Sequence, residues 1–334
     1  MSKPANAIRK ILEQGILINV TGRSWSGQAQ LHQTELGFTK GEIPKELINL
    51  GKKNLIPLDW RNRLKRPIQN ARNHVSRYAF PFPISNAFFV PAEAIPKVVE
   101  RLDECKKDFS KELGLFIREY ERIRDNQIVQ FRKELPDIYK RTVHGDFDEF
   151  VETFMSTLDR LYPPKDELRA KFDLVWQFFE VNLPDYKRRS GNFLVKQEEE
   201  NRKLAAQYQR EAQREINQFL NDVVITLRGE TVKVCSYVTD KIKRGEAVTG
   251  KNLNALKSLI DRFETLNFVG DAPIKEQLDS LRANYLNGHD GQYFKDNSSA
   301  TKSLQNALGV VMEAAQNISD VSSVTGNWKR RIKL

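Results

Sequence analysis

Residues 91–135 read PAEAIPKVVERLDECKKDFSKELGLFIREYERIRDNQIVQFRKEL, and this stretch decides the fold. Apolar side chains recur in it at gaps of three and four residues, while Lys, Arg, Asp and Glu fill most other positions. This spacing is typical of one helix with a single apolar stripe. At 1.5 Å per residue the helix would run on the order of 60 Å, longer than a compact domain needs. We therefore expect it to pair with another long helix.

Residues 192–242 are the expected partner helix. Their early part is very polar, and their later part is rich in Ile, Phe, Leu and Val at helical spacing. The two stretches together predict an elongated antiparallel helical hairpin or coiled coil. Two further helices, over residues 146–161 and 166–183, are predicted between them, and Pro136 predicts a kink or break.

Residues 1–90 predict a small α/β domain. The patterns indicate a short helix over residues 3–14, a strand over 16–20, a short helix within 36–50 and a hairpin over 80–91. The hairpin is expected to join the strand in a minor sheet. Before the hairpin, a helix with Asp59 as its N-cap is expected, and Pro67 predicts that this helix kinks or begins there.

Residues 246–334 predict shorter helices over 253–266, 274–286 and 299–318, followed by a basic tail. The expected fold class is therefore mainly α, with three parts. These are a basic α/β domain (1–90), a long helical hairpin with inserted helices over 146–183 (91–245), and a short-helix region (246–334).

Positive charge is concentrated at the two ends of the chain. Residues 1–80 carry 14 Lys and Arg against 5 Asp and Glu, and residues 321–334 add four basic side chains to a total net charge of +10. This asymmetry indicates an acidic partner, which is a nucleic acid, an acidic protein face or an anionic membrane surface. Because no long apolar run and no secretory leader occur, we expect no membrane span and a cytoplasmic location.

The candidate binding residues are basic and lie in two segments, the first over residues 61–77 and the second over residues 329–331. Trp60 and Tyr78 beside the first segment are candidates for stacking on bases, and the alternative is a solvated face around a core stripe. The second segment is either a disordered tail or a clamp that orders on binding. The candidates are Arg61, Arg63, Lys65, Arg66, Arg72 and Arg77 of the first segment and Lys329, Arg330 and Arg331 of the second.

No residue pattern indicates catalysis, a metal or a cofactor. His144 precedes Asp146, Asp148 and Glu149, but this cluster is expected to be a polar turn in which Asp146 caps the next helix. Gly250-Lys251 lacks the rest of a phosphate-binding loop. Cys105 and Cys235 stand at helical positions and are expected to be small buried hydrophobes. We predict no catalytic residue, no metal ligand and no cofactor.

Three short segments carry a resemblance to a known family: Trp25-Ser26-Gly27, Leu50-Gly51-Lys52-Lys53 and Phe88-Phe89-Val90-Pro91. With them, residues 15–180 resemble the uncharacterised bacterial and phage domain-of-unknown-function family 3150. Proteins of this kind are often encoded beside a MoxR-type AAA+ ATPase and a von Willebrand A-domain protein. The resemblance implies these two proteins as possible partners, and it supplies no activity and no catalytic residues.

Three functions follow as expectations. The first is a non-enzymatic helical adaptor or scaffold that works with a AAA+ ATPase complex and engages an acidic partner through its basic ends. The second is DNA or RNA binding without sequence specificity. The third is a self-assembling phage or bacterial structural protein, a homo-oligomer that forms through the long helices.

Overall fold

The computed structural model of the chain describes residues 10–36, 50–83, 87–142, 146–180, 195–317 and 319–331. Most of these residues are helical, and the strands are few and short, so the prediction of a mainly α protein is confirmed. The N-terminal half contains β1 (Gly15–Arg23), β2 (Gln28–Gln30), η1 (Gln33–Leu36), β3 (Lys52–Asn54), α2 (Leu58–Tyr78), β4 (Phe80–Pro81), β5 (Phe88–Pro91), η2 (Ala92–Ala94) and α3 (Ile95–Thr142). The remainder contains α4 (Phe147–Asp159), α5 (Lys165–Leu168), η3 (Arg169–Lys171), β6 (Asp173–Phe179), α6 (Val195–Lys243), α7 (Gly250–Leu266), α8 (Ala272–Leu281), the short π-helix η5 (Arg282–Leu286), α9 (Gly291–Asp296), α10 (Ser298–Gln316) and α11 (Val321–Arg331).

The chain packs as two compact units, each built from separate segments. The first unit comprises Met1–Asn19, Val75–Val98 and Gln177–Leu334, and the second comprises Val20–His74 and Val99–Trp176. Helices α2 and α3 each contribute residues to both units. The division of the sequence at residues 90 and 245 stays a prediction.

The main sheet has the strand order β4-β5-β1-β6. Strands β1 and β5 are antiparallel, with Gly15 opposite Pro91 and Ile18 opposite Phe88, and β4 pairs with β5. The predicted hairpin over 80–91 and its pairing with the strand over 16–20 are therefore confirmed, although its residues 84–86 lie outside the described part. A second, two-stranded sheet joins β2 and β3.

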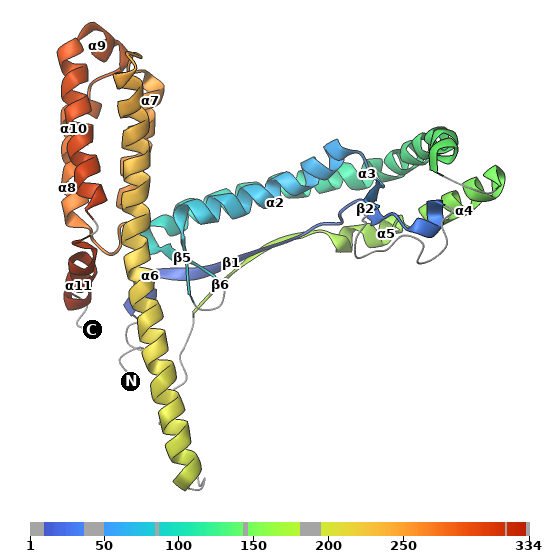
Figure 1. The fold of residues 1–334 in the computed structure, drawn as a ribbon, viewed down its shortest axis with the longest axis horizontal. Helices are drawn as coiled ribbons and strands as arrows, with labels where there is room; N and C mark the ends of the chain where they lie inside the picture. Colours follow the sequence, from blue (N-terminus) through green and yellow to red (C-terminus); the bar gives the residue numbers. More distant parts are fainter. Residues whose placement is uncertain are drawn as a thin grey trace. The chain divides into compact units, whose positions relative to one another are not determined.

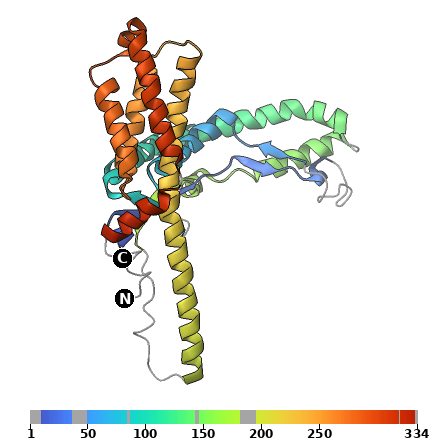
Figure 2. The same ribbon diagram turned by 60° about the vertical axis from the view of Figure 1, so that its left-hand side comes forward.

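In the first unit, long helix α6 is the centre of a helical bundle. It packs against α7, α10 and α11, and α10 also packs against α8; Figures 1 and 2 show α6, α7, α8 and α10 side by side in both views. The core includes Phe82, Phe89, Phe219 and Phe268, whose ring centroids lie 5.0–5.8 Å apart in the closest pairs. Strand β5 and helix α6 are therefore joined by one aromatic cluster.

In the second unit, α3 buries the stripe that its sequence predicts. Leu102, Cys105, Phe109, Leu113, Phe116, Tyr120 and Ile123 are buried. The ring centroid of Phe116 lies 5.6 Å from that of Trp60 in α2 and 5.9 Å from that of Phe172, which precedes β6. Both α2 and the segment before β6 therefore pack on the apolar stripe of α3. The Tyr120 hydroxyl donates to the carbonyl of Pro163 at 2.8 Å.

The structure corrects the predicted helix over 166–183 and the predicted break at Pro136. Residues 166–183 do not form one helix, because only α5 and η3 are helical and residues from Asp173 to Phe179 form β6. The segment Asp-Leu-Val-Trp-Gln-Phe-Phe is rich in aromatic and β-branched residues, which favour a strand, and pairing with β1 is decisive. The helix does not break at Pro136, because α3 continues to Thr142 without the backbone hydrogen bond that Pro136 cannot donate. A kink at Pro136 stays a prediction.

The expected helical hairpin is not confirmed. Helix α6 has α7, α10 and α11 as packing partners in its own unit, and α3 from Val99 onward belongs to the other unit. The C-terminal region holds the three expected helices as α7, α8 and α10, and it also contains α9 and α11. Residues 321–331 are helical, with Trp328 buried, so a disordered tail is wrong for this part.

Smaller expectations have mixed outcomes. Asp146 caps α4 as predicted, accepting from the Glu149 amide at 2.9 Å. Asp59 is not the N-cap of α2, because the helix already begins at Leu58. Three expectations fall wholly or partly outside the described residues: those for His144, for residues 37–49 and for residues 3–9. Within the helix expected over 3–14, residues 10–12 are described and are helical. Cys105 and Cys235 are both buried.

Candidate functional site

The candidate site is the exposed face of α2. Leu64, Ile68, Ala71 and Val75 are buried at helical spacing and fix which side of α2 faces the protein. The opposite side carries exposed polar residues over two turns. The candidate basic residues of the sequence fall at different angles around this helix, so the structure sorts them into separate roles.

Arg63 belongs to the packed side of the helix. Its guanidinium forms an ion pair with Glu112 of α3 at 2.7 Å, and its Nε donates to the same carboxylate at 2.8 Å. It also lies 4.0 Å from the centroid of the Trp60 ring. The Trp60 ring contacts both Arg63 and Phe116, so it acts as a packing residue between α2 and α3. We therefore leave Arg63 and Trp60 out of the candidate interface.

Arg61 lies at the edge of the face. It is half-buried, and its Nε is buried with no hydrogen-bond partner among the described residues. A Cβ placed on Gly27 would lie 3.5 Å from Arg61 Cγ, so the β1–β2 connection covers the stem of this side chain. Arg61 therefore contributes to local packing more than to an open surface.

Lys65, Arg66 and Arg72 form the part of the basic set that is exposed in the second unit, and we call them the α2 basic face. Lys65 and Arg66 have no ion pair or hydrogen bond with any described residue, and Arg72 donates weakly to the Gly22 carbonyl at 3.4 Å. Their exposed neighbours on the helix are the amides Asn62, Gln69 and Asn73. Asp59, in the first turn, is the one acidic residue in the sequence of α2.

The remaining sequence candidates belong to the first unit. Arg77 lies in the last turn of α2, with its guanidinium 6.0 Å from the centroid of the Tyr78 ring. Lys329 of α11 is half-buried, and burial lowers the pKa of its ammonium. Arg330 is exposed and bonds Asn327 of the same helix, whereas the side chain of Arg331 lies outside the described residues. The three α11 residues therefore form no part of the α2 basic face.

Metal clusters, membrane-spanning helices and shifted pKa values are three further features that bear on the chemistry of the described residues. No group of three or more His, Cys, Asp or Glu side chains gathers within this part of the chain as a metal ion would require. None of the helices in the described ranges is long and apolar enough to cross a bilayer. Burial raises the pKa of the Cys235 thiol to about 12 and that of the Tyr120 phenol to about 12, so both groups are neutral near pH 7.

Sequence reasoning missed the partners that divide the basic set. Glu112 is one of several acidic residues of α3, and nothing in the sequence around it indicates that it forms an ion pair with Arg63. Arg63 and Arg66 are three residues apart and lie only about 60° from each other around the axis of α2, so a helical wheel does not separate them. The contact with Glu112 distinguishes Arg63 from Arg66.

The fold and site describe a mainly α-helical protein with an exposed cationic helix face. Residues 12–283 match the family described as "Protein of unknown function (DUF3150)", and the chain belongs to this family. The match extends beyond residues 15–180, the range that carries the sequence resemblance, and includes α6 and α7. No curated protein and no solved structure matches the chain.

Proposed function

We propose that this protein is a non-enzymatic helical adaptor that docks an acidic partner on the α2 basic face. The observation that carries the proposal is the exposure of Lys65, Arg66 and Arg72 on one helix, without a carboxylate beside them on that face. In its family context the partner is an acidic surface of a MoxR-type AAA+ ATPase or of a von Willebrand A-domain protein.

The charge arrangement of α2 supports docking. Lys65 and Arg72 are seven residues apart, so the three cations occupy about 10 Å of helix. Neighbouring cations on one helix repel each other, and a carboxylate surface relieves this repulsion while it steers the encounter over long range. The solvent side of α3 shows the contrasting case, because its exposed Lys107, Lys111 and Arg118 alternate with Asp and Glu.

The test is a charge reversal with a matched control. The variant Lys65→Glu/Arg66→Glu/Arg72→Glu removes the basic face, and Lys107→Glu/Lys111→Glu/Arg118→Glu changes the net charge equally on α3. In a pull-down with the purified ATPase, we expect the wild type and the α3 variant to retain the ATPase and the α2 variant to lose it. Equal retention by all three proteins, or by none, contradicts the proposal. Far-ultraviolet circular dichroism checks that each variant keeps its helices.

A second candidate function is nucleic-acid binding without sequence specificity. The observation that favours it is the set of exposed amides beside the cations on α2, Asn62, Gln69 and Asn73, since amide and basic side chains together are common contacts of phosphate groups. If the three cations each neutralise one phosphate of duplex DNA, log K should fall against log salt with a slope of about −2.7. Fluorescence anisotropy with a labelled duplex measures this slope, and a salt-insensitive or undetectable signal contradicts this function.

Self-association through the long helices is also part of the proposal. Val129 of α3 is 66% exposed and Ile225 of α6 is 44% exposed, so both helices present apolar side chains to solvent. Coiled-coil pairing of residues 91–135 with 192–243 of a second copy would cover such positions. Light scattering over a range of protein concentrations should show a mass above that of the monomer, and a monomer throughout contradicts pairing.

A further inference from the structure

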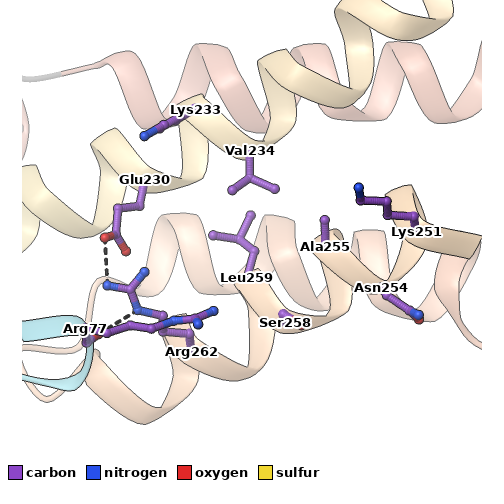
Figure 3. A pocket seen from close by; sticks show the side chains of 10 residues that line it. All are labelled: Arg77, Glu230, Lys233, Val234, Lys251, Asn254, Ala255, Ser258, Leu259 and Arg262. Carbon is purple, nitrogen blue, oxygen red and sulfur yellow. Dashed lines mark hydrogen bonds and ion pairs between the residues drawn. The ribbon is translucent and has the colours of Figure 1, made fainter. Parts of the chain in front are cut away.

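A pocket of about 470 Å³ lies between α6 and α7, two consecutive helices of the first unit. Figure 3 shows residues of α6 along one wall and residues of α7 along the other. The two helices are joined by residues 244–249, so the pocket is a groove inside one helical hairpin.

One end of the groove is closed by an ion pair. Arg262 of α7 contacts Glu230 of α6 at 2.7 Å, and its Nε donates to the backbone carbonyl of Arg77 at 2.8 Å. Figure 3 shows both interactions at the same end. Because Glu230 is the one carboxylate among the lining residues, this ion pair leaves no uncompensated negative charge in the groove.

Three cations of the groove remain unneutralised. Arg77, Lys233 and Lys251 are exposed, and no described carboxylate forms an ion pair with any of them. They come from α2, α6 and α7, respectively, so three different helices bring positive charge to one groove. The lining therefore carries an excess of three positive charges beside the Arg262–Glu230 pair.

The floor between these cations is aliphatic. Val234 of α6 and Leu259 of α7 point toward each other across the groove in Figure 3, and Ala255 lies between Leu259 and the first turn of α7. The small side chain of Ala255 leaves the space that the pocket occupies. A ligand that fits this groove must combine negative charges at its edges with an apolar group at its centre.

We propose that the α6–α7 groove binds an acidic segment of a partner protein, with an aliphatic side chain on the floor and carboxylates at Arg77, Lys233 and Lys251. This charge complementarity selects an acidic peptide over a neutral or basic one. The groove is a second binding site, separate from the α2 basic face, and it does not depend on the function proposed for Lys65, Arg66 and Arg72.

A nucleic acid fits the groove less well than a peptide. No aromatic side chain is among the lining residues, so no ring is available in the groove for a base to stack on. Tyr237 lies one turn beyond Lys233 on the same side of α6, but Lys241 is placed over its ring at 5.4 Å from the centroid. An aliphatic floor is instead suited to a Leu or Val side chain of a peptide.

Anisotropy of a fluorescein-labelled peptide tests the proposal on the full chain. The probe is a helical peptide with two leucines four positions apart and glutamates on either side, and its control replaces the glutamates with glutamines. Lys233→Glu/Lys251→Glu reverses the charge of the groove, and Ala255→Leu fills the floor without a change of charge. Lys243→Glu/Lys257→Glu is the matched control, because both residues are exposed on α6 and α7 but do not line the groove.

We expect the acidic peptide to bind the wild type and the Lys243→Glu/Lys257→Glu variant alike, and about tenfold more weakly to each groove variant. The glutamine peptide should bind as weakly as the acidic peptide does to the charge-reversed groove. Equal affinity for all four proteins, or no binding to the wild type, overturns the proposal. Tighter binding of a labelled oligonucleotide that depends on Lys233 and Lys251 but not on Ala255 also overturns it and assigns the groove to nucleic acid.

Discussion

Arg228 of α6 and Asp271, the residue before α8, form a buried bidentate ion pair. The distance from Arg228 Nε to Asp271 Oδ2 is 2.6 Å, and that from Arg228 Nη2 to Asp271 Oδ1 is 3.0 Å. The side chain of Arg228 is 3% exposed and that of Asp271 is 1% exposed. Arg228 also bonds Asp320 at 2.6 Å and the carbonyl of Asn317 at 2.5 Å. One guanidinium thus ties α6 to the turn before α8 and to the connection between α10 and α11, and its two carboxylate partners raise its pKa despite burial.

Removing one member of this pair should be costly. Asp271→Asn leaves a buried guanidinium with less compensation, and we expect a loss of about 3–5 kcal/mol in unfolding free energy. Urea denaturation measures this loss. Lys275→Gln, which removes an exposed ion pair with Asp279 one turn into α8, is the control and should leave the unfolding free energy nearly unchanged, because solvent screens this pair. Equal losses for the two variants would show that the Arg228 pair does not tie these segments together.

Gly22 of β1 makes a close approach to α2. A Cβ at this position would lie 2.2 Å from Cγ2 of buried Ile68, so Gly22→Ala forces a strand or helix to shift. We expect a loss of about 1–3 kcal/mol in unfolding free energy. Gly114→Ala in α3 has open space around the added methyl group and should stabilise by about 0.5–1 kcal/mol. Thermal denaturation of both variants checks the two opposite signs, and a stabilised Gly22→Ala would contradict the packing of β1 on α2.

The buried thiol of Cys235 should make stability depend on alkaline pH. Burial raises its pKa from 9.0 to about 12, so the folded state keeps a proton that the unfolded state loses above pH 9.0. This contribution to stability is therefore complete below pH 9.0 and is lost as pH rises from there toward pH 12. Between about pH 8 and pH 10 the loss from this group is about 1.4 kcal/mol. Urea denaturation of Cys235→Ala should show a fall smaller by that amount, and an unchanged pH dependence would disprove the assignment.

Arg63 should affect stability more than binding. Arg63→Gln removes the ion pair with Glu112 and the contact with the Trp60 ring, and each contact contributes about 0.5–1 kcal/mol at a half-exposed position. Trp fluorescence followed during urea denaturation measures the expected loss of about 1–2 kcal/mol. In the ATPase pull-down, Arg63→Gln should behave as the wild type does. Loss of the ATPase without loss of stability would place Arg63 in the interface.

The long-range features of the fold differ in how far the sequence predicts them. The buried stripe of α3 follows from a local pattern, because helical spacing reports the buried side directly. The strand over 16–20 also follows from local sequence, because its residues are mostly apolar and β-branched. Strand β6 was missed, since Phe172, Val175, Trp176 and Phe179 fit a helical period, and only the pairing of residues 173–179 with β1 makes this segment a strand. Helix α11 was missed because its polar and basic residues hide Trp328, which is buried in the first unit near Phe268.

The candidate site shows the same limit. The basic composition of α2 was evident from its sequence, but the separation of Arg63 from Lys65 and Arg66 depends on Glu112, which is 49 residues from Arg63. The α6–α7 groove combines Arg77, Lys233 and Lys251 from three helices, and no local pattern reports such a combination. Local spacing therefore predicted the helix that presents the charges, and tertiary contacts decided which of its charges are exposed.

The central claim is that Lys65, Arg66 and Arg72 engage an acidic protein. The most direct measurement is quantitative purification of three tagged forms from the native cell after nuclease treatment: the wild type, Lys65→Glu/Arg66→Glu/Arg72→Glu, and Lys107→Glu/Lys111→Glu/Arg118→Glu. We predict that the wild type and the α3 variant retain the same acidic protein at equal stoichiometry and that the α2 variant retains none. Equal recovery of that protein with all three forms, or a wild type that retains no protein after the nuclease treatment, would contradict the claim.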